Sequence, residues 1–176
     1  MRIARAGDTP QVKVSLNRLS PEARRNRFFS PMPGFSDQLV KQLTDVDPTL
    51  EHVLLVMRRE NGLEFPVGGG RFVITPDEYS AKPTRCEFAL VVGDLWQRQG
   101  IARRIMQGLI DEAIKRQLQQ MYGHILASNS GMLALAQALG FRIETPDEDA
   151  IVLATLALPQ RHVARWKKHL PDCWLS

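Results

Sequence analysis

The chain contains little cysteine and no long apolar run. Its two cysteines, Cys86 and Cys173, are too few to indicate a disulfide framework, so we expect both to be reduced thiols. No apolar stretch reaches the roughly 18 residues of a membrane-spanning helix, and the N-terminus lacks the apolar segment of a secretory signal. We therefore expect a soluble cytoplasmic protein without a membrane partner.

The charge is basic but scattered. The formal net charge is +4, which makes a nucleic-acid partner worth considering. No aromatic residues alternate with the basic clusters in a way that would indicate base stacking. We interpret the basic residues as a solvated face with some attraction for an acidic ligand and expect no nucleic-acid partner. The densest clusters are Arg24, Arg25 and Arg27, then Arg103 and Arg104, then residues 161–168.

Hydrophobic spacing and turn residues predict one domain of alternating helices and strands. Thr9-Pro10 and Ser20-Pro21 are typical of a cap followed by a proline in the first helical turn. The order indicates an α+β domain with a central mixed, mostly antiparallel sheet flanked by helices. Strands are expected at residues 2–5, 52–57, 65–74, 86–92, 120–127, 141–144 and 151–158, and helices at 10–19, 21–29, 37–46, 101–118 and 130–139.

Two glycine-containing segments predict local backbone features. Asn61-Gly62 between two apolar runs indicates a two-residue hairpin turn. The glycines of residues 68–70 lie inside a strand pattern, and no Lys-Ser/Thr pair follows them as in a phosphate-binding loop. We therefore expect a β-bulge at these glycines.

The segment 91–102 has the layout of a diphosphate-binding loop. An apolar strand ends at Val92, a glycine-containing turn follows, and an amphipathic helix begins at about Ile101. The first N–H groups of a helix lack partners within the helix and, with its dipole, form an anion site. Gly100 would let a phosphate approach the backbone, since it has no Cβ.

Three segments resemble one known family. The pattern Gln97-x-x-Gly100-x-Ala102 is similar to the coenzyme A diphosphate signature of the GNAT superfamily of acyl-CoA-dependent N-acyltransferases. Residues 129–141 resemble the family's asparagine, short helix and Leu-Gly-Phe ending. Residues 18–29 are similar to the region after the first helix in bacterial Pat-type protein lysine acetyltransferases. The resemblance spans residues 2–158, which predicts a GNAT-like domain at 1–158 and a basic tail at 159–176 packed on or extending from it.

The resemblance implies where acetyl-CoA binds. The strand before the loop and the strand after its helix would splay apart, and backbone groups of Leu90, Val91 and Val92 would pair with the pantetheine arm. Asn129 would bond the same arm, cap the following helix, or both. Arg98, Arg103 and Arg104 would reach the phosphates or remain solvated. The coenzyme-binding set in the loop and helix is Gln97, Arg98, Gln99, Gly100, Ile101, Ala102 and Arg103.

A candidate general base lies on the strand before the loop. The resemblance implies that Glu87 deprotonates the acceptor amine, and we expect it among the small apolar side chains Ala89 and Val91 of its own strand face. The alternative is a charged residue at a strand end, paired with Arg85 or Arg71. His124 could serve as an acid or base, although a lone strand histidine is more often structural. No histidine has a partner at metal-ligand spacing, so we predict no metal.

One departure from the family leaves two functions open. Seven residues after Asn129, where many members carry a tyrosine that protonates the leaving thiolate, this chain has Ala136. The main hypothesis is an N-acetyltransferase that moves the acetyl group of acetyl-CoA to a primary amine, protein lysine included, in a ternary complex. The alternative is a non-catalytic acyl-CoA-binding or sensing module. The acidic residues 147–149 favour a cationic acceptor, or form only a charged turn.

Overall fold

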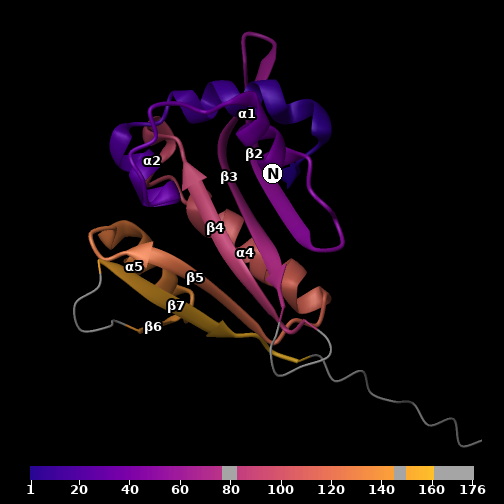
Figure 1. The fold of residues 1–176 in the computed structure, drawn as a ribbon, viewed down its shortest axis with the longest axis vertical. Helices are drawn as coiled ribbons and strands as arrows, with labels where there is room; N and C mark the ends of the chain where they lie inside the picture. The colour runs from indigo at the N-terminus through magenta and orange to yellow at the C-terminus, as the bar shows by residue number, and fades with distance from the viewer. Residues whose placement is uncertain (77–82, 145–149, 161–176) are drawn as a thin grey trace, which may run out of the picture.

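A seven-stranded sheet organises the molecule, with its strands in the order β1-β2-β3-β4-β5-β7-β6 (Figure 1). The computed structural model describes residues 1–76, 83–144 and 150–160. Neighbouring strands run antiparallel except β4 and β5, which are parallel. The expected α+β fold with a mixed, mostly antiparallel sheet is therefore confirmed. The strands are β1 (Arg2–Ile3), β2 (Glu51–Glu60), β3 (Leu63–Thr75), β4 (Arg85–Val92), β5 (Gln120–Leu126), β6 (Arg142–Glu144) and β7 (Ile151–Ala157).

Helices cover both faces of the sheet and divide the core into two clusters. One cluster lies under the N-terminal helices α1 (Thr9–Asn17), α2 (Pro21–Phe28) and α3 (Asp37–Thr44). The larger cluster lies under α4 (Ile101–Lys115) and α5 (Ser130–Ala138) on the other face. Two short 3-10 turns, at Ala6–Asp8 and Asp94–Trp96, complete the described elements. Within the described residues, no helix has the length and apolar character needed to cross a membrane.

Two of the three N-terminal helices begin where the cap signals predict. The hydroxyls of Ser20 and Ser36 accept the backbone N–H groups three residues on, at 3.1 and 3.2 Å. The expectation for Thr9 is wrong, because Thr9 is the first residue of α1 and not its cap. Asp8 precedes it, and its carboxylate is bound by the Arg2 guanidinium at 2.6 and 2.7 Å.

Helix α4 is shorter than its sequence pattern indicates. It ends at Lys115, three residues before the expected end, because Gln117 adopts a left-handed conformation with φ of 61°. This reversal lets the Leu118 N–H donate to the Ala113 carbonyl at 3.1 Å and leads directly into β5. Leu118 therefore enters the core from the turn and not from the helix.

The glycines of β3 allow close packing and do not form the bulge themselves. The register between β2 and β3 shifts between Val56 and Met57, which places the extra residue at Val67, just before the glycines. The glycines pair regularly with β2, and a Cβ on Gly70 would lie 2.4 Å from the Ile105 side chain of α4. The predicted hairpin turn is confirmed, since Asn61 and Gly62 have φ of 50° and 78°.

We expect Gly70→Ala to destabilise the protein by about 1–3 kcal/mol, because the added methyl group overpacks the contact between β3 and α4. Urea unfolding followed by circular dichroism measures the change. Gly7→Ala is the control, since a Cβ there meets nothing within 4 Å, and it should leave the unfolding free energy unchanged or raise it by up to about 1 kcal/mol. Equal stability of the two variants would contradict this account.

Candidate active site

The parallel strands β4 and β5 separate after a short paired segment. They are paired only where Arg85–Glu87 faces residues 120–122, and beyond this point they diverge, as Figure 1 shows. No described strand pairs with the β5-facing edge of β4 from Phe88 to Val92. A cleft of about 530 Å³ opens between the strands and is bounded by α2 and the start of α4. The expected splayed strand pair is present, and its free edge can accept an extended ligand.

Unpaired backbone donors line the end of this cleft at the start of α4. Within the described residues, the backbone N–H groups of residues 98–103 have no acceptor, and the first helical bond runs from Arg104 N–H to the Gly100 carbonyl at 3.1 Å. Gly100 has φ of +77°, and a Cβ there would meet nothing within 4 Å. Together with the helix dipole, these donors can attract an anion, and they open onto free space.

The structure places most of the expected coenzyme-binding residues on the cleft. The exception is Gln99, whose side-chain amide donates to the Leu95 carbonyl at 3.1 Å. The Gln97 amide folds back and donates to the Val92 carbonyl at 3.2 Å, so this carbonyl of the free strand edge already has a partner. The cleft is lined by Leu90, Val91, Val92, Gln97, Arg98, Gly100, Ile101, Ala102, Arg103 and Asn129.

Asn129 caps α5 and also faces the cleft. Its side-chain oxygen accepts the Met132 N–H at 3.1 Å, which is the cap geometry expected from the sequence. The same residue lines the cleft where β5 ends. The side-chain amide nitrogen of Asn129 makes no described hydrogen bond and can donate to a ligand.

Glu87 is paired with a histidine of the neighbouring strand. The Nδ1 atom of His124 lies 2.9 Å from the Glu87 carboxylate, and the two side chains are 46% and 42% exposed. Ala89 and Val91 share the strand face and the cleft with Glu87 as expected, but they do not enclose its carboxylate, which is partly exposed and reaches across the fork between β4 and β5. The alternative pairing with arginine is wrong. Arg71 binds Glu51 at 2.9 Å, and Arg85 lies over the Tyr122 ring.

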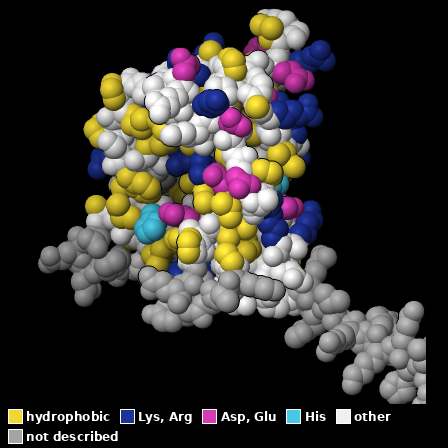
Figure 2. All heavy atoms as spheres, turned by 45° about the vertical axis from the view of Figure 1, so that its right-hand side comes forward, with side chains coloured by type: hydrophobic (Ala, Val, Ile, Leu, Met, Phe, Trp, Pro, Cys, Tyr) yellow, Lys and Arg dark blue, Asp and Glu magenta, His cyan; other side chains and the backbone are white. Residues whose placement is uncertain are grey.

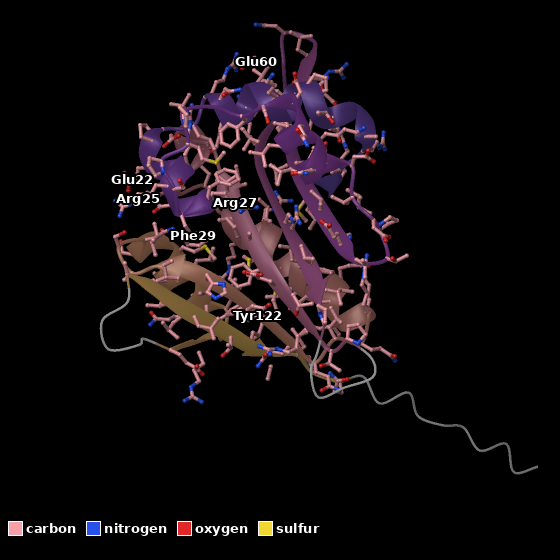
Figure 3. All side chains as sticks on the ribbon, in the orientation of Figure 1. Glu22, Arg25, Arg27, Phe29, Glu60 and Tyr122 are labelled. Atoms are coloured by element: carbon pink, nitrogen blue, oxygen red, sulfur yellow. The ribbon has the colours of Figure 1, made fainter. Side chains whose placement is uncertain are left out.

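A basic side chain enters the cleft from α2. Ala23 of this helix is buried, and Arg27, four residues on, faces the same way and lines the cleft (Figure 3). Burial lowers the pKa of Arg27 to about 10, repulsion from Arg71 acts in the same direction, and the Glu87 charge opposes both. Arg27 is therefore still a cation at neutral pH.

The interpretation of the first basic cluster as a solvated face is correct for Arg25 alone. Arg24 donates to the carbonyls of residues 17, 32 and 33 at 2.7–3.1 Å, so it ties α2 to the loop that follows. Arg25 is exposed and points away from the cleft (Figure 3). Figure 2 shows basic, acidic and histidine side chains around the hollow on one face of the molecule.

A hydrogen-bonded contact joins the start of α2 to the segment that precedes the loop at residues 98–103. The Asp94 carboxylate accepts the Ser20 N–H at 2.9 Å and the Ser20 hydroxyl at 2.5 Å. Burial acts to raise the pKa of Asp94, but these bonds outweigh it and hold the pKa below its ordinary value. The start of α2 and the entrance to the loop are therefore fixed relative to each other.

Other expected residues lie away from the cleft or outside the described ranges. Ala136 is completely buried in the larger core cluster, so this position presents no side chain to a ligand. Tyr79 and the acidic residues 147–149 fall outside the described residues, as does the tail from residue 161. Within residues 1–76, 83–144 and 150–160, no group of three His, Cys, Asp or Glu side chains could hold a metal ion.

Comparison with known proteins identifies the class to which this fold and cleft belong. Residues 19–141 match the Acetyltransferase (GNAT) family. The chain is 32% identical to Acetyltransferase PA5475 of Pseudomonas aeruginosa over 159 residues, which cover 90% of this chain and 83% of that protein. This chain therefore belongs to the GNAT family of acetyltransferases, and the prediction of an acetyl-CoA-dependent N-acetyltransferase is confirmed.

More distant relatives share part of the sequence or the fold alone. The [Ribosomal protein bS18]-alanine N-acetyltransferase of Escherichia coli is 36% identical over 77 residues, which cover 38% of this chain and 52% of that enzyme. The solved GNAT domain of S. lividans PAT has a TM-score of 0.79 at 21% identity and covers 89% of each chain. The Salmonella typhimurium protein yncA, solved with acetyl-CoA, has a TM-score of 0.66 at 18% identity and covers 90% of this chain and 93% of its own.

The Ser20–Asp94 contact predicts a pH-dependent contribution to stability. Since the folded state lowers the pKa of Asp94, the contribution is present above the unfolded-state pKa of about 3.9 and is lost as the pH falls through the lower folded-state value. We expect Asp94→Asn to reduce the unfolding free energy by on the order of 0.5–1 kcal/mol at pH 7, with a smaller difference at pH 3. Urea titrations at both pH values measure it.

Asp111→Asn is the control for this prediction, because Asp111 is exposed on α4 and makes no described ion pair. It should change the unfolding free energy by less than about 0.5 kcal/mol at either pH. An Asp94→Asn effect that is equally large at pH 3 and pH 7 would argue against the proposed origin.

Proposed function

We propose that this protein transfers the acetyl group of acetyl-CoA directly to a primary amine while both are bound, with Glu87 as the general base. The observation that carries the proposal is the position of the Glu87–His124 pair, at the fork of the split strands and on the same cleft as the unpaired donors of residues 98–103. A thioester laid along the free edge of β4 has its diphosphate end at α4 and its acyl end near Glu87.

The amine must lose a proton before it can attack. An alkylamine with a reference pKa of about 10.4 is almost entirely protonated at pH 7, so a positioned base increases the fraction that can react. Glu87 accepts this proton, directly or through a water molecule. His124 acts as a positioning residue, since an Nδ1–H donor to the Glu87 carboxylate fixes the direction in which the second carboxylate oxygen faces.

Main-chain groups of β4 supply the remaining steps. Attack on the thioester creates a negative oxygen, and a backbone N–H near Leu90 or Val92 on the free edge can donate to it. The CoA thiolate then leaves and takes a proton from water, since a thiol with a pKa near 8.5 tolerates departure as the anion. A tyrosine at the position of Ala136 is therefore not required.

The acceptor remains a primary amine in this proposal. The Pat-type resemblance alone points to a protein lysine, whereas the S. lividans PAT domain, at 21% identity, supports the fold and not the acceptor. The relative named for ribosomal protein alanine matches only 38% of this chain. The alternative of a non-catalytic acyl-CoA-binding module is less well supported, because a binding module has no need of a carboxylate oriented by a histidine at the acyl end of the cleft.

We expect Glu87→Gln to lower kcat by about 10²–10⁴ while acetyl-CoA affinity stays unchanged, because the amide cannot accept the proton. CoA release over a panel of amines measures turnover, and calorimetry measures binding. Glu60→Gln is the matched control, since Glu60 lies at the exposed hairpin end far from the cleft (Figure 3). Wild-type protein that binds acetyl-CoA but acetylates no amine would support the non-catalytic module instead.

We expect Gly100→Ala to raise the Kd for acetyl-CoA by about tenfold, since alanine is strained by on the order of 1 kcal/mol at φ of +77° and shifts the neighbouring N–H donors. Gly62→Ala is a matched control, because Gly62 has φ of +78° and equally open surroundings but lies in the β2–β3 hairpin. It should lose comparable stability and keep the wild-type Kd. No detectable binding of acetyl-CoA or CoA by wild-type protein at millimolar concentration would overturn the proposed function.

A further inference from the structure

Arg27 is a partly buried cation without a partner of opposite charge. Within the described residues its guanidinium makes no hydrogen bond and no ion pair, and its one described contact is with the Phe28 ring, 4.9 Å from the centroid. The neighbouring arginines differ in this respect. Arg24 donates hydrogen bonds to backbone carbonyls, and Arg71 forms an ion pair with Glu51. Burying a cation without a partner of opposite charge costs free energy. This cost indicates that Arg27 binds an anionic group of a ligand.

Arg27 lies at the reacting end of the cleft and not at the diphosphate end. It shares pocket lining with Ala89 and Val91, which are on the same face of β4 as Glu87. The charges that perturb it are those of Glu87 and Arg71, and no ion pair joins it to Glu87. The segment 98–103 already has its own donors for a diphosphate. An anion at Arg27 therefore belongs to a second molecule or to the acyl group.

We propose that the acceptor is an α-amino acid, whose carboxylate is bound by Arg27 while its amine faces Glu87. This inference rests on the proposed function and specifies its substrate class. The planar guanidinium fork matches a carboxylate in a bidentate geometry. The two sites also match the charges of a zwitterion, since the cationic side chain meets the carboxylate and the anionic side chain meets the ammonium group.

The rim of the cleft favours an apolar side chain on this amino acid. Phe29, at the end of α2, is 41% exposed and lines the cleft beside Arg27 (Figure 3). Glu22 of the same helix is exposed on this rim, and its charge repels an acidic side chain on the amino acid. Leucine, methionine and phenylalanine are therefore suitable probes. A polyamine or a lysine-rich peptide would bring a cation towards Arg27, which disfavours the cationic acceptor expected from residues 147–149.

The experiment compares each probe amino acid with its primary amide, which keeps the side chain and the amine but lacks the negative charge. Wild-type protein should acetylate the free acids with kcat/KM at least about tenfold higher than the amides. This preference is opposite to that expected from basicity, because the less basic amine of the amide has the larger neutral fraction at pH 7. Arg27→Met should raise KM for the acids by about tenfold or more and leave KM for the amides and the Kd for acetyl-CoA within about twofold. Arg27→Lys should recover part of the loss, because it restores the charge without the fork.

Arg25→Met is the matched control. It removes the same charge from the same helix, two residues away, at an exposed position outside the cleft. It should leave all three constants at their wild-type values. Thermal melts of the Arg27 and Arg25 variants verify that each is folded, and Arg27→Lys tests the proposal if Arg27→Met does not fold.

Several outcomes would overturn the assignment. One is a wild-type preference for amides, polyamines or lysine peptides. Another is an equal loss of kcat/KM for acids and amides in Arg27→Met. A third is an Arg27-dependent preference for succinyl-CoA over acetyl-CoA, which would place the anion on the acyl donor. Failure of the proposed function is recognised separately. If no amine is acetylated, the proposed function fails, and calorimetry of leucine with the CoA-loaded protein then tests the carboxylate site alone. Leucine binding that depends on Arg27 would support that site, and no leucine binding would overturn the second proposal as well.

Discussion

The structure depends on the failure of β4 and β5 to pair along their length. β4 remains bonded to β3 up to Val92, and β5 remains bonded to β7 up to Leu126, so each strand is held by its own half of the sheet. Within the described residues, strand pairing joins the two halves only where residues 85–87 face residues 120–122, and the Thr84 carbonyl extends this contact by accepting the N–H groups of Gln119 and Gln120. Backbone groups on an unpaired edge are unsatisfied unless a ligand or water meets them, which is why a free strand edge favours an extended, amide-rich molecule. The loop at residues 98–103 adds a group of unpaired N–H donors at one end of the same cleft.

The fork also determines where charge can act. It brings Glu87 of β4 and His124 of β5 within hydrogen-bonding distance, and α2 adds the unpaired Arg27 above them. The Ser20–Asp94 contact couples the position of α2 to the segment that leads into α4. The start of α2 and the segment that leads into α4 are therefore fixed relative to each other by these hydrogen bonds. In the proposed reaction, this carboxylate, histidine and guanidinium surround the point where the thioester and the amine meet.

Local patterns in the sequence were sufficient for the element order and for the loop of unpaired N–H groups before α4. The Asn61-Gly62 turn, the serine caps and Gly100 each depend on the conformation of a few adjacent residues, and the structure has them where the pattern indicates. Predictions that depended on packing were less accurate. The bulge lies at Val67, while Gly70 is a glycine because a Cβ there would collide with α4. Helix α4 ends early because the chain turns back into the sheet at Gln117.

The chain by itself therefore determined the family, the fold class and the conformation of the loop before α4, since these are carried by contiguous segments and short-range physics. Only the tertiary structure decided the partners of the charged residues. Glu87 and His124 are 37 positions apart, and strand parity gives each a face without saying which strands are neighbours. The four-residue spacing between Ala23 and Arg27 indicates that both lie on one face of α2. The role of Arg27 could be inferred only from the packing of α2 over β4. Charges separated in sequence meet only when the sheet order is formed, and that order is a property of the whole core.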